Sequence, residues 1–237
     1  MRISLSKFTV VSFAVATAAA LSACGPSIDP AAKADIDRRS SLLSPGAQAY
    51  PAPGAFMPRP LAVGQWVQYR MVDDKNQPSF LTHKVVGAEG NAFWIEGVTE
   101  SYTGKQVTKI LAFLGDRTNL SAVEIWGVKT RDHKGHVQEF DKSMLSIMQG
   151  LWKGAIEGLI VSWQGQPQED ATVPAGRFTS CFKARSDVAW GPWHSASTGW
   201  SHAAVPISGL VKSQGIDKPM TMDLVGFGDT GAVSELP

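Results

Sequence analysis

The chain has 237 residues, enough for one substantial hydrophobic core or two small ones. Hydrophobic residues make up 43% and charged residues 18%, which is typical of a globular protein and excludes a disordered one. The formal net charge of +1 provides no basic field for nucleic acid, and removal of a leader carrying Arg2 and Lys7 leaves 20 basic against 21 acidic residues.

The first 23 residues are predicted to be a secretory signal peptide. Arg2 and Lys7 supply the positive start, residues 8–20 form an apolar run too short to span a bilayer comfortably, and small residues follow. This leader is therefore excluded from fold reasoning.

The sequence that ends the leader, Leu21-Ser22-Ala23-Cys24, resembles the lipobox of bacterial lipoproteins. The resemblance implies that Cys24 carries diacylglycerol and further acyl chains, which together make a stable membrane anchor. Gly25 follows in place of an acidic residue, which implies sorting to the periplasmic face of the outer membrane. The alternative is ordinary cleavage within "ATAAALSA", which would leave Cys24 unmodified.

Residues 24–60 are predicted to be the lipidated cysteine and a flexible tether. Seven prolines between Pro26 and Pro60 lie among alanine, serine and glycine, a composition that favours extended chain. Residues 31–43 could form a helical turn or two.

From residue 61 to 237, the sequence predicts a single antiparallel β domain. Short apolar-rich runs, such as 66–72, 80–87, 92–101 and 106–115, are separated by turns rich in glycine, asparagine and aspartate. No helices intervene between these runs, which argues against a parallel sheet. The expected fold class is mainly β, a curved antiparallel sheet shaped as a half-barrel or clam, with one packed α-helix.

Residues 141–159 are predicted to be that helix. Met144, Met148 and Trp152 recur at near-helical spacing, and Asp141 or Ser143 could serve as the N-cap. The helix would either cover the sheet or plug a lipid-sized pocket in its concave face.

The segments "VPAGRFTSCFKAR" (173–185) and "VPISGLVKSQG…TMDLVGFG" (205–228) resemble those of uncharacterised bacterial envelope β-sheet lipoproteins and, more loosely, the LolA/LolB lipoprotein carriers. The resemblance implies a strongly curved sheet around a helix that can hold a lipid or acyl chain.

Few residues point to chemistry. Cys181 lies within a predicted strand and is expected to be an inert buried thiol, with no disulfide to Cys24. His133 and His136 flank a turn beside Asp132, and paired acids occur at 73–74 and 169–170, but neither pattern provides three ligands for a metal. We therefore predict no catalytic residue, no metal and no cofactor.

Binding residues are sought instead among the aromatic and methionine side chains. Three tryptophans crowd residues 190–200, where they could pack as bulk or form a binding patch. The predicted ligand-binding set is Met144, Met148, Trp152, Trp190, Trp193 and Trp200.

The chain is expected to be a membrane-anchored protein and not an enzyme, but the sequence leaves three hypotheses of function open, the third of them enzymatic. The first is binding of a hydrophobic ligand or acyl chain on the concave sheet face. The second is a structural or protein-interaction lipoprotein without a pocket, and the third is a carbohydrate-active or hydrolytic envelope protein. The expected partners are the membrane, through the anchor, and a lipid or envelope protein, with no nucleic acid.

Overall fold

We describe a computed structural model of the chain, covering residues 27–55, 57, 59–115, 117, 122–141, 144–145, 163, 165–190 and 193–237. Side chains are described for these residues except 187–190 and 193–195. The signal peptide and Cys24 lie outside the described residues. The helix is α1 (Pro30–Ser41), and the strands are β1 (Ala49–Tyr50), β2 (Trp66–Val72), β3 (Pro78–Glu89), β4 (Ala92–Ser101), β5 (Gly104–Phe113), β6 (Glu124–Arg131), β7 (Val137–Phe140), β8 (Gln168–Val173), β9 (Gly176–Trp190), β10 (Trp193–Ser201), β11 (Leu210–Gly215) and β12 (Thr221–Gly228).

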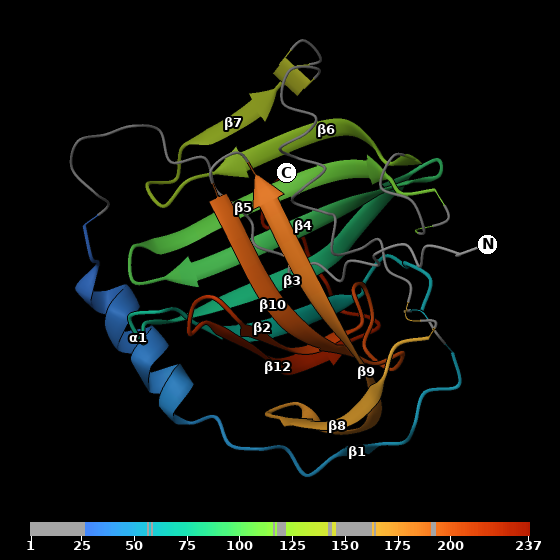
Figure 1. Cartoon of the computed structure of the whole chain (residues 1–237). Helices are drawn as coiled ribbons and strands as arrows, with labels where there is room; N and C mark the ends of the chain where they lie inside the picture. The colour runs from blue at the N-terminus through green and yellow to red at the C-terminus, as the bar shows by residue number, and fades with distance from the viewer. Residues whose placement is uncertain are drawn as a thin grey trace.

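The strands form one 12-stranded sheet made of two antiparallel meanders (Figure 1). Strands β2 to β7 follow one another in the first meander, and β9 to β12 follow one another in the second. Antiparallel pairing of β12 with β2 joins the two, while β1 adds to β9 in parallel and β8 pairs with β9 off the main path. The predicted mainly β fold with a curved antiparallel sheet is confirmed.

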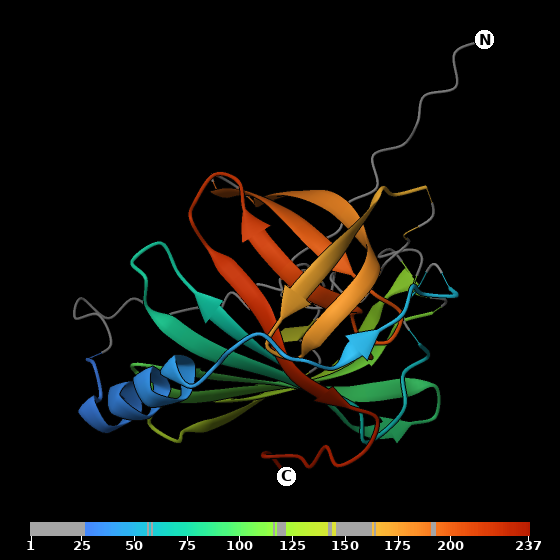
Figure 2. The same cartoon turned by 90° about the horizontal axis from the view of Figure 1, so that it is seen from below.

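The sheet bends until its two meanders face each other across a shared core (Figure 2). Register shifts interrupt five strand pairs, and each leaves an extra residue on one strand. Such bulges bend a strand and increase its twist, which accounts for the strong curvature.

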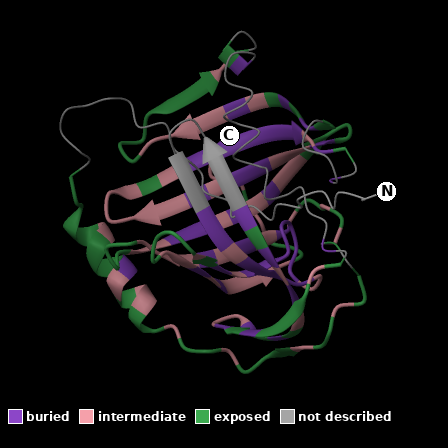
Figure 3. Cartoon of the chain, in the orientation of Figure 1, coloured by how far each residue is buried: buried purple, intermediate pink, exposed green. Residues whose placement is uncertain are grey.

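The core lies between the two meanders, and buried residues alternate with half-buried ones along much of β2 and β3 (Figure 3). Val85, Ile95, Ile110 and Val128 are cross-strand neighbours that face inward from β3 to β6. The second meander adds further members of the same cluster, Phe178, Cys181, Trp200, Val211 and Leu224. The face opposite this core in the first meander is called the outer face below.

Residues predicted to form a flexible tether belong to the folded unit. Asp29 caps α1, its carboxylate accepting the backbone N–H of Ala31 at 2.9 Å, and Arg39 pairs with Glu100 of β4 at 3.2 Å. The Arg39 guanidinium also lies 4.1 Å from the centre of the Phe80 ring, which α1 helps to bury. Residues 29–50 are therefore folded, whereas the sequence predicted a flexible tether. Polar contacts hold α1 in place, although the apolar periodicity of the helix is weak.

The helix predicted over 141–159 falls mostly outside the described residues. Met144 and Leu145 are helical, and the Asp141 carboxylate accepts the N–H of Met144 at 2.9 Å, as expected of the predicted N-cap. Met148 and Trp152 lie outside the described part, so the plug hypothesis stays a prediction.

One bulge changes which residues of β9 share a face. The sequence alternation groups Phe178 with Phe182 and sets Cys181 opposite them, but the register shifts opposite Asp170. Ser180 takes a φ of 57°, and its N–H donates to the Asp170 carboxylate at 2.9 Å. Phe178 and Cys181 consequently share the main core, while Phe182 stacks on Trp163 in a separate cluster.

Candidate functional site

Of the predicted ligand-binding set, the structure describes the side chains of Met144 and Trp200, so the set stays a prediction. Met144 is 38% exposed, whereas Trp200 is only 6% exposed. The Nζ atoms of Lys183 and Lys212, on the two flanking strands, lie 5.1 and 5.3 Å from the Trp200 ring centre. Trp200 is therefore covered by cation–π contacts. Trp190 and Trp193 are backbone partners in the β9–β10 hairpin, and their side chains are not described.

In the part of the chain that the structure describes, the concave face is packed with side chains. The loop 202–209 enters the space between the meanders, and its Val205 and Ile207 are fully buried. The Tyr69 hydroxyl donates to the Leu210 carbonyl at 3.0 Å, and Gly209 lies directly under the Trp163 indole. These contacts leave the hydrophobic-ligand hypothesis dependent on residues 146–162, which are not described.

The histidines and paired acids of the sequence analysis occupy turns, bulges and the core. The Asp132 carboxylate accepts the N–H groups of Lys134 and His136, and the His136 ring contact lowers the pKa of Asp132 to about 2. Asp73 makes the corresponding turn contacts with Lys75 and Gln77. Among the described residues no three His, Cys, Asp or Glu side chains are grouped to hold a metal ion.

Cys181 is a fully buried thiol within β9. Its Sγ donates to the Phe178 carbonyl at 3.6 Å, and burial raises the pKa of the thiol to about 12. Because the thiolate is the reactive form, this environment makes the native thiol unreactive.

We expect a Cys24→Ala chain to show no reaction of Cys181 with Ellman's reagent under native conditions, and one thiol per chain in denaturant. The physical reason is burial together with the raised pKa. The measurement is absorbance during thiol titration at pH 8. Rapid labelling of the folded protein would contradict the buried position.

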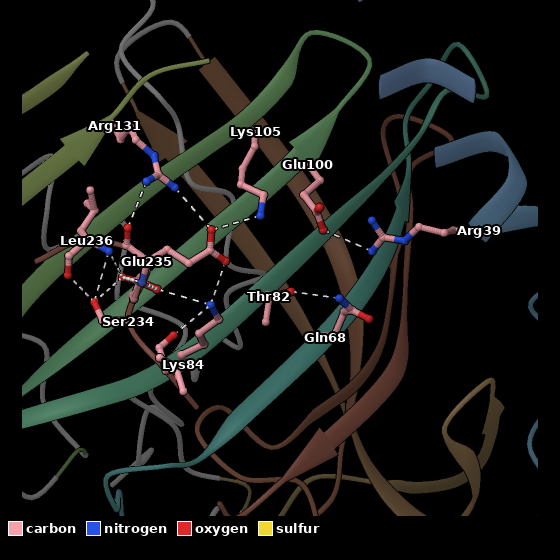
Figure 4. Close-up of polar contacts among 12 residues, drawn as sticks. Arg39, Gln68, Thr82, Lys84, Glu100, Lys105, Arg131, Ser234, Glu235 and Leu236 are labelled. Atoms are coloured by element: carbon pink, nitrogen blue, oxygen red, sulfur yellow. Dashed lines mark hydrogen bonds and ion pairs between the residues drawn. The ribbon is translucent and has the colours of Figure 1, made fainter. Parts of the chain in front are cut away.

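The outer face of the first meander carries a row of charged side chains. Lys84, Glu96, Lys109 and Lys129 are cross-strand partners on β3, β4, β5 and β6. Residues 229–237, the C-terminal segment, cross this row on its outer side (Figures 2 and 4).

Glu96 is the centre of these contacts and is fully buried. Its carboxylate accepts the N–H groups of Glu235 and Leu236 at 3.0 and 3.2 Å and the Ser234 hydroxyl at 2.8 Å. Lys84 bridges Glu96 to Glu235, which also pairs with Lys105 and Arg131 (Figure 4). The charged row is therefore used to hold the C-terminal segment.

The same outer face has two tryptophan side chains near the first residues of β4 and β6, which lie at the same end of the sheet. Trp94 lies beside Gly87 of β3 and reaches over Leu111 towards Gly127 of β6, where an added Cβ would meet the indole at 3.1 Å. The absence of a side chain at Gly127 thus lets the Trp94 ring lie flat against the sheet. The Trp94 indole N–H donates to the Glu89 carboxylate at 2.7 Å, which fixes its orientation.

Trp126 is the extra residue of the β6 bulge and is 43% exposed. Its ring lies nearly parallel to that of Phe113, with 6.2 Å between centroids and 17° between planes. Its indole N–H donates to Glu124, the cross-strand partner of Phe113, at 2.9 Å. Trp94, Phe113 and Trp126 are called the aromatic surface below.

Sequence reasoning missed the aromatic surface. Trp94 and Trp126 fall within predicted strands, where alternation alone assigns them to a packed sheet. The available signal was the "WG" pair at 126–127, since glycine within a strand often marks a bulge or a close approach.

Comparisons with known proteins leave the chain without a family. No protein-family model matches it, and no curated protein sequence matches it. It is similar to a solved structure from Bacteroides fragilis, described as a protein inferred to be exported with a YMCC-like fold, at 12% identity and a TM-score of 0.37. The match covers 73% of this chain and 100% of that one, and at this level it carries no argument about function. The fold defines the chain only as a mainly β protein with one curved sheet.

No helix among the described residues has both the length and the apolar character needed to span a bilayer.

Proposed function

We propose that this chain is a lipid-anchored protein of the bacterial envelope that binds a partner protein through the aromatic surface and catalyses no reaction. The proposed localisation rests on the sequence, in which a lipobox-like Leu-Ser-Ala-Cys directly follows a secretory leader. The absence of an acidic residue at position 25 favours the outer membrane, with the folded unit facing the periplasm.

The observation that carries the binding role is the fixed pair of the exposed Trp126 and the half-buried Phe113, whose rings are stacked. Large aromatic side chains dominate the binding energy of protein interfaces, and rigid ones lose little entropy on binding. The Glu124 contact holds the Trp126 indole in place before any partner arrives. Binding on the outer face is favoured over the concave face because the described concave face is filled by the core.

A protein fits this surface better than a polysaccharide. Both indole N–H groups are already bonded to carboxylates, and the Lys109 amino group donates to the Leu236 carbonyl at 2.8 Å. The surface therefore offers aromatic area with few unengaged donors for sugar hydroxyls. The acids of the sequence analysis likewise support a non-catalytic role, since Asp73, Asp132 and Asp170 organise turns and a bulge.

We expect the photoreactive residue p-benzoylphenylalanine, placed at Phe113 of the full-length protein in its source bacterium, to form a protease-sensitive adduct of defined mass. Adding Trp126→Ala should weaken binding by about 2 kcal/mol, or about 30-fold, and remove the adduct. The measurement is the mass shift on immunoblots after irradiation.

Val137 is the matched control, because it is 58% exposed on β7 and lies outside the aromatic surface. The photoreactive residue at Val137 should give no such adduct. An equal adduct at both positions, or none at Phe113, would refute the proposed binding surface. An adduct that glycan hydrolases degrade and proteases do not would identify a polysaccharide instead of a protein.

A further inference from the structure

The distance between the anchor and the folded unit is short. The folded part begins at Asp29, whose N–H donates to the Tyr102 carbonyl at 2.8 Å and whose side chain caps α1. Four residues separate Cys24 from Asp29, and the five residue-to-residue steps span at most about 18 Å. A flexible tether of the predicted length would have left the unit free to rotate, whereas this link leaves it little freedom.

Three segments meet at the end of the sheet where the link arrives. They are the start of α1, the β4–β5 turn (101–104) and the β6–β7 turn (132–135), together called the proximal edge. The Lys33 amino group lies 4.7 Å from the centre of the Tyr102 ring. An added Cβ at Gly104 would lie 3.5 Å from the His133 Cβ, so the two turns are neighbours.

The chemistry of the proximal edge suits a bilayer surface. Ile28 is 55% exposed and lies four residues after Cys24, where it can enter the interface beside the acyl chains. His133 and Lys134 are exposed in the 132–135 turn, and a basic side chain near anionic headgroups contributes about 1 kcal/mol.

We propose that the proximal edge contacts the bilayer that holds the Cys24 acyl chains, so that the strands of the first meander lead away from the membrane. This inference rests on the proposed lipidation of Cys24. The aromatic surface lies at the other ends of β4, β5 and β6, opposite α1 (Figure 1). Trp94 and Ser101 are seven positions apart, about 23 Å along β4, which keeps the aromatic surface clear of the bilayer.

Fluorescence quenching in liposomes tests this orientation with the full-length lipidated protein. The buried Cys181 allows selective labelling of one introduced cysteine, Lys134→Cys at the proximal edge or Asn91→Cys in the β3–β4 turn at the far end. Lipids with a nitroxide on the headgroup should quench a bimane label at position 134 at least twofold more than one at 91. Equal quenching, or stronger quenching at 91, would overturn the proposed orientation.

The intact mass of the protein distinguishes failure of the proposed orientation from failure of the proposed function. If Cys24 carries no acyl chains, the anchor itself is refuted, whatever the quenching shows. In the acylated protein, a 20-residue Gly/Ser insertion after Gly25 should abolish the difference between the two labels. A difference that persists in the insertion variant would refute the role of the short link.

Discussion

Glu96→Ala is expected to lower the free energy of unfolding by about 3 kcal/mol, because it leaves several buried polar groups without an acceptor. The carboxylate accepts two consecutive backbone N–H groups and the Ser234 hydroxyl, and it faces the Lys84 amino group at 3.5 Å. Alanine removes the carboxylate that all of these donors share, at a position with no access to water.

The C-terminal segment should detach in the same variant. Leu236, which packs in a small cluster with Val98 and Val107, would then become exposed. Urea unfolding measures the loss of stability, and limited carboxypeptidase digestion measures the release of residues 232–237.

Glu139→Ala is the matched control for Glu96→Ala. Glu139 also pairs with a lysine of the outer face, Lys129, but its side chain is 70% exposed. Its removal should change the free energy of unfolding by less than about 0.5 kcal/mol. Equal stability of Glu96→Ala and the wild-type protein would show that Glu96 does not hold the C-terminal segment.

The sheet could be predicted from sequence because its signal is local. Each strand of the first meander alternates inward and outward side chains, and polar turns mark the ends, so β2 and β4 have the predicted bounds. The bulges could not be predicted in this way. At Trp126 and Ser180 a single extra residue shifts the alternation, and the shift depends on the partner strand.

The N-terminal segment shows why composition alone was misleading. Proline and alanine indicated a tether, and α1 buries only Ile36 among its hydrophobic residues. The helix is held instead by Arg39 on Glu100 and by the Tyr102 hydroxyl, which donates to Asp37. Both partners of α1 lie more than 60 residues away in sequence, so no local pattern could reveal them.

The surroundings of the tryptophans also depend on residues that are distant in sequence. Trp190, Trp193 and Trp200 are close in sequence, but Trp200 is covered by Lys183 and Lys212 from the flanking strands. Trp94 and Trp126 are 32 positions apart and are brought to one face by the pairing of β4, β5 and β6. Strand pairing can therefore bring together residues that no sequence cluster indicates.

Acidification from pH 7 to pH 4 is expected to remove about 3 kcal/mol of stability through His83 alone. His83 is 2% exposed on the inner face of β3, with the Tyr69 ring edge-on at a centroid distance of 6.3 Å. Burial disfavours the charged imidazole and lowers its pKa from 6.5 to about 4.

Stability falls with pH because the unfolded chain binds a proton at His83 more readily than the folded protein does. The unfolded chain binds a proton at this histidine below pH 6.5, whereas the folded protein binds it only below about pH 4. The contribution is complete above pH 6.5 and is lost as the pH falls through that window, about 2 kcal/mol of it by pH 5. Burial also lowers the pKa of His202, which adds to the loss in the same direction.

His83→Gln separates this contribution from that of the acids. Glutamine does not titrate, so the variant should lose most of the decline in unfolding free energy between pH 6.5 and 5. Acids with a lowered pKa, such as Glu235, begin to remove stability only near their unfolded value of 4.5. His136→Gln is the control, since that side chain is 76% exposed, and the variant should keep the decline in unfolding free energy between pH 6.5 and 5. Urea unfolding at half-unit pH intervals gives the slopes, and the same slope in His83→Gln and wild type would rule out a buried neutral His83.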